Sequence, residues 1–390
     1  MKARKKSKIK ICVYAIAKNE AKFAVKWYNS MKEADYVAVL DTGSTDNTVK
    51  ILKNLGAIVE TKVIDPWRFD VARNESMKLV PDDADVLVCT DLDEVFEDGW
   101  ADAIRDAWIP GVHERGEYNY IWKHNPDGSP DVLYNYNKIH TRNWIWRTPV
   151  HEYLTRENDD KNFYYTKEKT CFLHDKITLH HFPDNTKSRQ GYLDLLKIRV
   201  DEYPDDKISV LYLAREYWFR NQYENAIEML KGIVADADSF KPIHIAFSYM
   251  MMGSSYIGLA ERQSDDNKKQ QYLYDAENAL NTGIEKYPTY MENYTLLGTM
   301  YATHGYWDAA RKIIEMGFSK AVRIYDWTET GVNWEESPLT TLGACYSYLG
   351  YKVKAVACFA KAYKINPNSF ILSNNFFNCL NSLSINELIK

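Results

Sequence analysis

The chain has 390 residues, with 49 Lys and Arg, 54 Asp and Glu and 9 His, so its formal charge is −5 with the histidines neutral. Apolar residues make up 45% and charged residues 26% of the chain, which excludes global disorder and is typical of a globular protein with two or three domains. Glycine, at 17 residues, is too scarce for a collagen. No uncharged apolar run approaches the ~20 residues of a membrane span. The acidic balance argues against a nucleic-acid partner, since nucleic-acid-binding proteins usually carry a basic face.

The N-terminal residues are basic and are followed by a short apolar run at 11–17, which ends at Lys18, Asn19 and Glu20. Seven apolar residues are better explained as a buried first strand than as the core of a signal peptide. Six cysteines are scattered without a C-x-x-C pair, and four of them lie in apolar runs. We therefore expect reduced core cysteines and a cytoplasmic protein.

The first part of the chain alternates between strand and helix patterns. Strands are predicted over 10–17, 35–40, 57–63 and 84–90, and helices over 20–31, 46–55 and 72–79. Continuously apolar strands separated by helices indicate parallel strands that are buried on both faces, and hence a doubly wound α/β domain. Ligands of such domains lie at the carboxyl ends of the strands. Residues 110–182 are less regular and predict mixed or antiparallel strands with long loops.

From about residue 186 the apolar pattern becomes helical, and most Pro and Gly residues fall at turns. Four pairs of helical segments follow one another, at 210–217 with 221–227, 248–259 with 275–276, 294–301 with 305–310, and 342–349 with 350–356. They resemble tetratricopeptide repeats, whose period is ~34 residues, over 206–369 with an insertion at 261–271. Such repeats bury their faces only by stacking. An ordinary helical domain is the alternative, and under both interpretations this part binds or packs and does not hold the chemistry.

Two acidic residues follow the apolar strand at 84–90. Because side chains alternate along a strand, Asp91 and Asp93 point the same way, and two close carboxylates favour a cation between them. A divalent ion such as Mg²⁺ or Mn²⁺ suits such a pair and also binds substrate phosphates. A solvated turn after the strand is the alternative, and the position at the end of a buried strand favours the metal.

Two further motifs lie at predicted strand ends. The segment 41–46 reads D-T-G-S-T-D, in which Asp41 ends a strand and Asp46 opens the next helix. Asp46 is explained by helix capping, whereas Asp41 lies where ligands bind. At 72–74 the residues Ala-Arg-Asn lie near a predicted helix start, where Arg73 and Asn74 suit a phosphate or nucleotide contact.

In this order, these motifs resemble the family 2 glycosyltransferases of the GT-A fold over residues 9–185. The family's first nucleotide-binding loop is similar to 15–20, its Asp-Asp-Gly-Ser-Thr-Asp motif matches 41–46 with Thr42 in place of the second acid, its Ala-Arg-Asn matches 72–74 and its D-x-D matches 91–93. The resemblance implies that a metal, Mn²⁺ or Mg²⁺, bridges the D-x-D and the donor diphosphate. The residues it implies at the nucleotide sugar are Asn19, Glu20, Asp41, Arg73, Asp91 and Leu92.

The resemblance extends to two histidine-containing segments further along the chain. Family members with helical repeats carry a His-Glu pair and a later His, which match His151-Glu152 and the His180-His181 pair. By this resemblance Glu152 is the expected catalytic base. His180, rather than His181, is the expected metal or diphosphate ligand, beside Asp93 and Asp91. Trp122, Trp144 and Trp146 lie where an acceptor would bind, and one of them is a candidate for stacking on a sugar face.

The sequence thus predicts two domains, a Rossmann-like GT-A domain with a mostly parallel sheet at 1–185 and a repeat domain at 206–390, joined by a linker helix at 186–205. The expected enzyme is an inverting hexosyltransferase that uses a UDP-sugar donor and a protein, peptide or glycan acceptor. The layout also resembles sublancin-type peptide glycosyltransferases. Alternatives are a repeat scaffold with an inactive transferase-like domain, or a lipid-linked glycan, cell-surface glycan or phage DNA acceptor. A homodimer through the repeats is expected, with no transmembrane segment.

Overall fold

The structure is a computed structural model that describes residues 9–125, 128–156, 169–184, 191–324, 326–329 and 332–384. The chain divides into two compact units, Met1–Lys123 with Leu133–Arg199, and His124–Val132 with Val200–Lys390. The division after Arg199 falls inside helix α5 (Tyr192–Glu202), within the linker segment predicted at 186–205. The basic N-terminal residues 1–8 lie outside the described residues.

The first unit begins with the predicted parallel strands. These are β1 (Ile11–Ala17), β2 (Tyr36–Asp41), β3 (Ile58–Thr61) and β4 (Val86–Cys89), in the spatial order β3-β2-β1-β4. Between them lie α1 (Ala21–Met31), α2 (Thr48–Leu55) and α3 (Phe69–Met77). All seven elements expected for residues 10–90 are present. One difference is that β3 is mostly exposed, because it forms the edge of the sheet.

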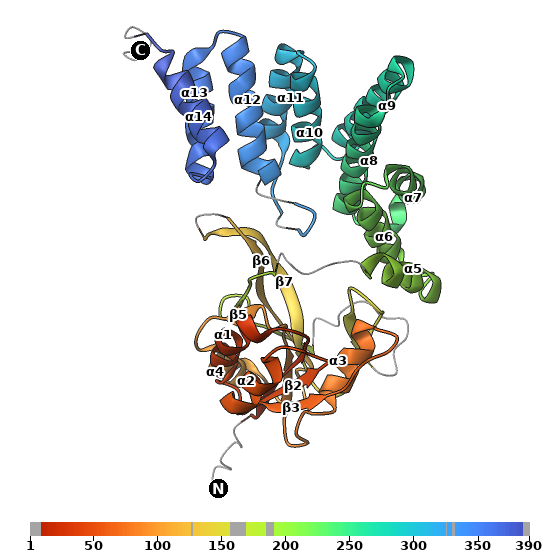
Figure 1. The fold of residues 1–390 in the computed structure, drawn as a ribbon, viewed down its shortest axis with the longest axis vertical. Helices are drawn as coiled ribbons and strands as arrows, with labels where there is room; N and C mark the ends of the chain where they lie inside the picture. Colours follow the sequence, from red (N-terminus) through yellow and green to blue (C-terminus); the bar gives the residue numbers. More distant parts are fainter. Residues whose placement is uncertain are drawn as a thin grey trace. The chain divides into compact units, whose positions relative to one another are not determined.

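The rest of the sheet is mixed, as the sequence predicts for residues 110–182. Strand β7 (Pro130–His140) is antiparallel to β4, and β11 (Thr178–His181) is parallel to β6 (Arg115–His124) but antiparallel to β5 (Glu94–Phe96). Strand β10 (Thr170–Phe172) also pairs with β6 in parallel. Among the described residues, the order is β3-β2-β1-β4-β7-β6-β11-β5, and the long β6 and β7 lie side by side in Figure 1.

Side chains alternate along β1, so neighbouring residues lie on opposite faces of the sheet. Val13 and Ala15 join the core that contains α1, α2 and α4 (Trp100–Ala107), where Trp27 and Trp100 are among the largest fully buried side chains. Cys12 and Tyr14 point to the opposite face, which is covered by the end of α3 and by a small sheet of β8 (Trp144–Arg147) and β9 (Tyr153–Arg156). Both faces of the parallel strands are therefore buried, as continuous apolar strands require.

The second unit is built of antiparallel helix pairs, which stand side by side in Figure 1. The helices are α6 (Lys207–Phe219), α7 (Tyr223–Ala235), α8 (Pro242–Arg262), α9 (Asp266–Lys286), α10 (Met291–Thr303), α11 (Trp307–Lys320), α12 (Ser337–Tyr348), α13 (Lys352–Ile365) and α14 (Phe370–Asn381). The expected insertion at 261–271 lies where α8 ends and α9 begins, and both helices have 21 residues. The insertion is therefore taken up by longer helices.

Small residues bring the helices of each pair together, which is why the repeats need them. A Cβ built on Gly253, Gly298 or Gly343 would lie 2.6 Å from Leu280, 2.5 Å from Ile314 and 2.8 Å from Phe359, respectively. Each contact joins the first helix of a pair to the second, in α8–α9, α10–α11 and α12–α13. The recurrence at the same place in successive pairs confirms the helical-repeat organisation that the sequence pattern predicts.

The cysteines expected in the core are buried, and so are three tryptophans of the first unit. All six cysteines, which fall in described ranges, are buried and unpaired. Trp27, Trp100 and Trp108 are each at most 5% exposed. No helix among the described residues is both long enough and apolar enough to cross a membrane.

Candidate active site

The predicted site residues follow the carboxyl ends of neighbouring strands. Since β1, β2 and β4 are parallel, Asn19 and Glu20 after β1, Asp41 at the end of β2 and Asp91 after β4 all lie at one edge of the sheet. Parallel topology therefore brings together residues that are far apart in the sequence. The structure divides them into two groups with different surroundings.

The first group ties the loops after β1 and β2 to each other. The side-chain carbonyl of Asn19 accepts a hydrogen bond from the backbone amide of Thr45 at 2.7 Å, and the backbone amide of Asn19 donates to Ser44 Oγ at 2.8 Å. Asp41 is 1% exposed and accepts the amides of Gly43 and Ser44 at 3.2 and 3.1 Å. These side chains fix the shape of the two loops that are expected to hold the nucleotide sugar.

Glu20 and Asp46 complete this connection. The amide of Glu20 donates to Thr48 Oγ1 at 2.8 Å, and Thr48 Oγ1 in turn donates to Asp46 at 2.5 Å. Asp46 also accepts the amide of Ala21 at 3.2 Å. Asp46 is therefore a structural residue near the start of α2, as its position in the motif predicts.

The second group centres on Arg73, a 3% exposed residue of α3. Its Nη2 atom donates to both oxygens of Asp91 at 2.9 and 3.1 Å, and its Nε atom donates to Glu152 Oε1 at 2.5 Å. The guanidinium also lies over the ring of Trp146, 5.2 Å from its centroid. In this arrangement Arg73 positions two of the predicted catalytic and ligand carboxylates, whereas the sequence suggests a direct nucleotide contact.

Two buried residues that the sequence analysis missed extend this cluster. Lys138 of β7 is 4% exposed and donates to Asp91 Oδ2 at 3.1 Å and to Glu94 Oε1 at 3.4 Å. Glu94 is 1% exposed and also accepts the amide of Asp91 at 2.9 Å and the hydroxyl of Tyr120 at 2.9 Å. Lys138 lies in an irregular segment 47 residues after Asp91, so only the pairing of β7 with β4 reveals it.

The charges in this cluster decide which groups hold protons. Burial would raise the pKa of Asp91, but the nearby charges of Arg73 and Lys138 outweigh burial and lower it well below its usual range. Burial raises the pKa of Glu94, and the charge of Asp91 adds to this effect while Lys138 opposes it. Asp91 therefore stays ionised, and the cluster keeps a permanent negative group at the end of β4.

Asp93 faces His181, and this differs from the prediction for the histidine pair. His181 Nε2 lies 3.4 Å from Asp93 Oδ2, and the amide of Phe182 donates to the Asp93 carbonyl at 2.7 Å. His180 points to the other side of β11, where its Nε2 contacts Glu97 at 3.0 Å and its ring stacks on Phe182. The physical reason is the alternation of side chains along a strand, which places neighbouring residues on opposite faces. His180 is thus replaced by His181 as the candidate ligand.

The Asp93–His181 pair suits a divalent metal whose other ligands come from substrate and water. His181 Nδ1 contacts the Trp122 carbonyl at 2.9 Å, which fixes the proton on Nδ1 and leaves Nε2 to face Asp93. Mg²⁺ is commonly held by one or two carboxylates together with substrate phosphates, and Mn²⁺ accepts similar oxygen ligands. The described residues contain no group of three His, Cys, Asp or Glu placed to hold a metal by themselves. Asp91 is already paired with two cations, so Asp93 and His181 are the protein ligands that fit.

Glu152 lies in a loop with unusual backbone geometry. Thr148 and His151 have φ angles of 74° and 51°, a region that residues other than glycine rarely adopt. Arg199 of α5, 1% exposed, donates from Nη1 to the carbonyls of Val150 and His151, both at 2.8 Å. A buried guanidinium thus holds the loop that presents Glu152 to Arg73.

The aromatic candidates for a sugar platform separate clearly by exposure. Trp146 is 3% exposed and donates from Nε1 to the hydroxyl of Tyr14 at 2.7 Å, so it belongs to the core and its predicted stacking role is corrected. Trp144 is half-buried against the same core. Trp122 is 43% exposed and its ring stacks on that of His181 with 6.3 Å between centroids, so of the three it is the exposed one that contacts the partner of Asp93.

The chain was compared with protein families, curated proteins and solved structures. No protein-family model matches the chain. A protein of Rickettsia bellii (strain RML369-C), named an uncharacterized glycosyltransferase, is 32% identical over 133 residues, which cover 33% of this chain and 44% of that protein. The chain therefore matches less than half of the length of that relative. Among solved structures, the thermophilic TPR protein TTC0263 of Thermus thermophilus is 21% identical with a TM-score of 0.39 over 49% of this chain and 90% of its own. MamA is 21% identical with a TM-score of 0.33, over 46% and 89%.

Proposed function

We propose that the chain is a metal-dependent glycosyltransferase that takes a sugar from a nucleoside diphosphate donor, with UDP as the expected nucleotide. The observation that carries the proposal is that Asp91 and Glu152 meet at the buried Arg73, with Lys138 also paired to Asp91, and that Asp93 of the same segment faces His181. The name of the Rickettsia relative is consistent with it. GT-A fold, family 2 membership and inversion at the anomeric carbon are part of the proposal.

The charges of the cluster suit a donor that arrives with a divalent ion. With His181 neutral, the carboxylates of Asp91, Asp93, Glu94 and Glu152 and the cations of Arg73 and Lys138 sum to about −2 when all are in their usual states. A divalent ion offsets this charge, and it would supply the stabilisation of negative charge on the leaving diphosphate. Asp93 and His181 would hold the ion, and Arg73 would keep Asp91 and Glu152 in place.

Glu152 is the proposed base toward the acceptor hydroxyl or thiol. An inverting transfer needs one carboxylate to accept the acceptor's proton as the new bond forms. Glu152 is held by Arg73 at 2.5 Å through Oε1, and its side chain is 11% exposed. Oε1 is occupied in this arrangement, so we assign the proton to Oε2.

The test is release of the nucleoside diphosphate from a panel of UDP-, GDP- and TDP-sugars, with Mn²⁺ and with EDTA. We expect turnover of one UDP-sugar with Mn²⁺, loss of turnover with EDTA, and loss in Asp93→Asn. Asp98→Asn is the matched control, because Asp98 is an exposed acid of the same segment.

A second outcome would favour the scaffold alternative. If no sugar nucleotide is turned over, and none raises the melting temperature in the presence of Mn²⁺, the donor site is wrongly assigned. Equal activity of Asp93→Asn and Asp98→Asn would remove Asp93 from the metal site while leaving the enzyme class standing. Mass spectrometry of cellular polypeptides and glycans incubated with the donor would then identify the acceptor class.

A further inference from the structure

The charged side chains of the C-terminal helices of the second unit are all positive. Residues 337–384, which span α12 to α14, contain four lysines and no Asp, Glu, Arg or His. The whole chain has a formal charge of −5, so the remaining residues sum to −5 − 4 = −9. All four lysines, Lys352, Lys354, Lys361 and Lys364, lie on α13. This helix is therefore a local cationic surface on an acidic protein.

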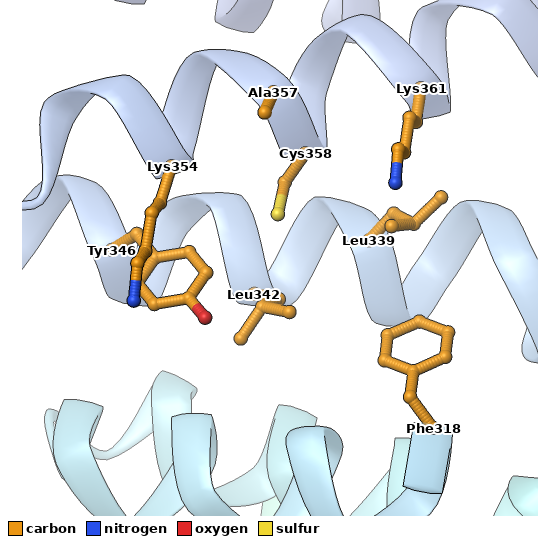
Figure 2. A pocket seen from close by; sticks show the side chains of 8 residues that line it. All are labelled: Phe318, Leu339, Leu342, Tyr346, Lys354, Ala357, Cys358 and Lys361. Carbon is orange, nitrogen blue, oxygen red and sulfur yellow. The ribbon is translucent and has the colours of Figure 1, made fainter. Parts of the chain in front are cut away.

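A groove of about 320 Å³ runs beside this helix. Its walls come from α11, α12 and α13, and Figure 2 shows their side chains converging on it. The apolar part is formed by the buried Leu342 and Cys358, the partly buried Leu339 and the 45% exposed ring of Phe318. The groove is large enough for one apolar side chain of leucine or phenylalanine size.

Two lysines mark the ends of the groove. Lys354, Ala357, Cys358 and Lys361 lie at positions i, i+3, i+4 and i+7 of α13, so they share one face of the helix. In Figure 2 Lys354 and Lys361 stand on either side of Cys358. At about 1.5 Å per residue, their Cα atoms are about 10 Å apart along the helix.

Within the described residues, neither ammonium group is paired with a carboxylate. Lys354 lies over the rings of Tyr346 and Tyr351, 5.3 and 5.5 Å from their centroids, and neither Lys354 nor Lys361 pairs with a carboxylate among the described residues. The nearest acid that interacts with groove residues is Glu315, which accepts from the Tyr346 hydroxyl and is paired with Arg311 at 2.6 Å. The positive charges at the two ends are thus available to a partner.

We propose that this groove binds a peptide segment of a protein partner in which one apolar side chain lies between two acidic residues. Alternate side chains of an extended chain point to the same side and are about 6.6 Å apart, so carboxylates four residues apart lie on the same side as the apolar residue midway between them, about 13 Å from each other and within reach of the long lysine side chains. The apolar residue between them enters the groove over Leu342 and Cys358. A hollow of this size favours a peptide over a flat anionic surface, because a membrane or a nucleic acid needs no cavity for a single side chain. This proposal concerns binding alone and is independent of the transferase reaction.

The experiment measures fluorescence anisotropy of a fluorescein-labelled peptide that contains Glu-Ser-Leu-Ser-Glu between Gly-Ser flanks, with the full chain. We expect saturable binding that weakens about tenfold when Lys354 or Lys361 is changed to Glu, since each change places like charges opposite each other. Ala357→Phe, which fills the groove from its exposed wall, should weaken binding similarly. Lys364→Glu is the matched control, because it makes the same charge change on α13 outside the groove.

Other results would overturn the proposal. Equal weakening by Lys361→Glu and Lys364→Glu would indicate unspecific attraction to a cationic helix. Equal binding of a Glu-Ser-Ser-Ser-Glu peptide would show that the groove takes no apolar side chain. Absence of peptide binding, together with binding to vesicles of phosphatidylserine and phosphatidylcholine, would assign the surface to membranes. Release of the nucleoside diphosphate should be the same in the Lys361→Glu variant and the unchanged protein, so failure here is distinct from failure of the proposed function.

Discussion

Acid should destabilise the first unit through one buried histidine, His140. It is fully buried on β7, where its Nε2 contacts the Tyr14 hydroxyl at 2.7 Å and its Nδ1 contacts the Thr141 carbonyl at 2.8 Å. Since a carbonyl only accepts, Nδ1 carries the proton and Nε2 accepts from Tyr14. Both ring nitrogens are thus satisfied in the neutral form, and burial lowers the pKa of His140 from 6.5 to about 4.

The direction and size of the effect follow from this shift. The unfolded chain takes up the proton near pH 6.5, whereas the folded protein resists it until about pH 4. The stabilisation is therefore complete above pH 6.5 and is lost as the pH falls from 6.5 to 4. At about 1.4 kcal/mol per pKa unit the total is roughly 3 kcal/mol, of which about 2.5 kcal/mol is lost by about pH 4.5.

Urea unfolding at about pH 7.0, 5.5 and 4.5 tests this, with His140→Gln compared with the unchanged protein. The variant should be less stable at about pH 7.0, and the difference in free energy of unfolding should shrink by about 2.5 kcal/mol at about pH 4.5. Carboxylates and the buried His244 titrate equally in both proteins and cancel in the difference. His304→Gln, a change of an exposed histidine, serves as the control. A constant difference across the three pH values would refute the reasoning.

Two further predictions concern stability. Lys138→Met should lower the free energy of unfolding by about 3–5 kcal/mol at neutral pH, because it leaves the carboxylates of Asp91 and Glu94 together without their shared buried cation. Chemical denaturation measures this free energy, and a loss below about 1 kcal/mol would contradict the buried pairing. Gly298→Ala should destabilise the repeats by about 1–3 kcal/mol, because its Cβ would lie 2.5 Å from Ile314. Gly232→Ala, where nothing lies within 4 Å, should stabilise α7 by about 0.5–1 kcal/mol, and thermal melts that rank the two variants otherwise would count against the packing argument.

Much of the first unit could be predicted because its local signals agree. We could predict β1 to β4 and the loops after them from apolar runs, helix periodicity and acids at strand ends. Parallel strands that are buried on both faces are continuously apolar, which makes them easy to recognise in a sequence. Residues 110–182 could not be placed in the sheet, because their pairing depends on contacts between distant segments. Strand β6 pairs with β11, which lies about 60 residues further on, and no local pattern encodes that partner.

The same distinction applies to the candidate site. Asp91 and Asp93 could be found because they follow a strand directly, and Glu152 because of its neighbour His151. Lys138 and Glu94 were missed, since a single Lys in an irregular strand and an acid after a D-x-D carry no separate signal. The role of Arg73 also differs from expectation, because its burial between two carboxylates depends on the approach of the loop that holds Glu152.

The two neighbouring histidines of β11 have a consequence for how sequence changes would act there. Leu179 is fully buried, and side chains two residues apart share a face, so Leu179 anchors His181 on the Asp93 side. A deletion or insertion of one residue in the turn before Thr178 would exchange the faces on which His180 and His181 lie, so an imidazole would still face Asp93. The same slip would turn Leu179 out of the core, at a cost of about 1.5–3 kcal/mol. Leu179 has no part in the chemistry, but its burial thus determines which of the two histidines faces Asp93.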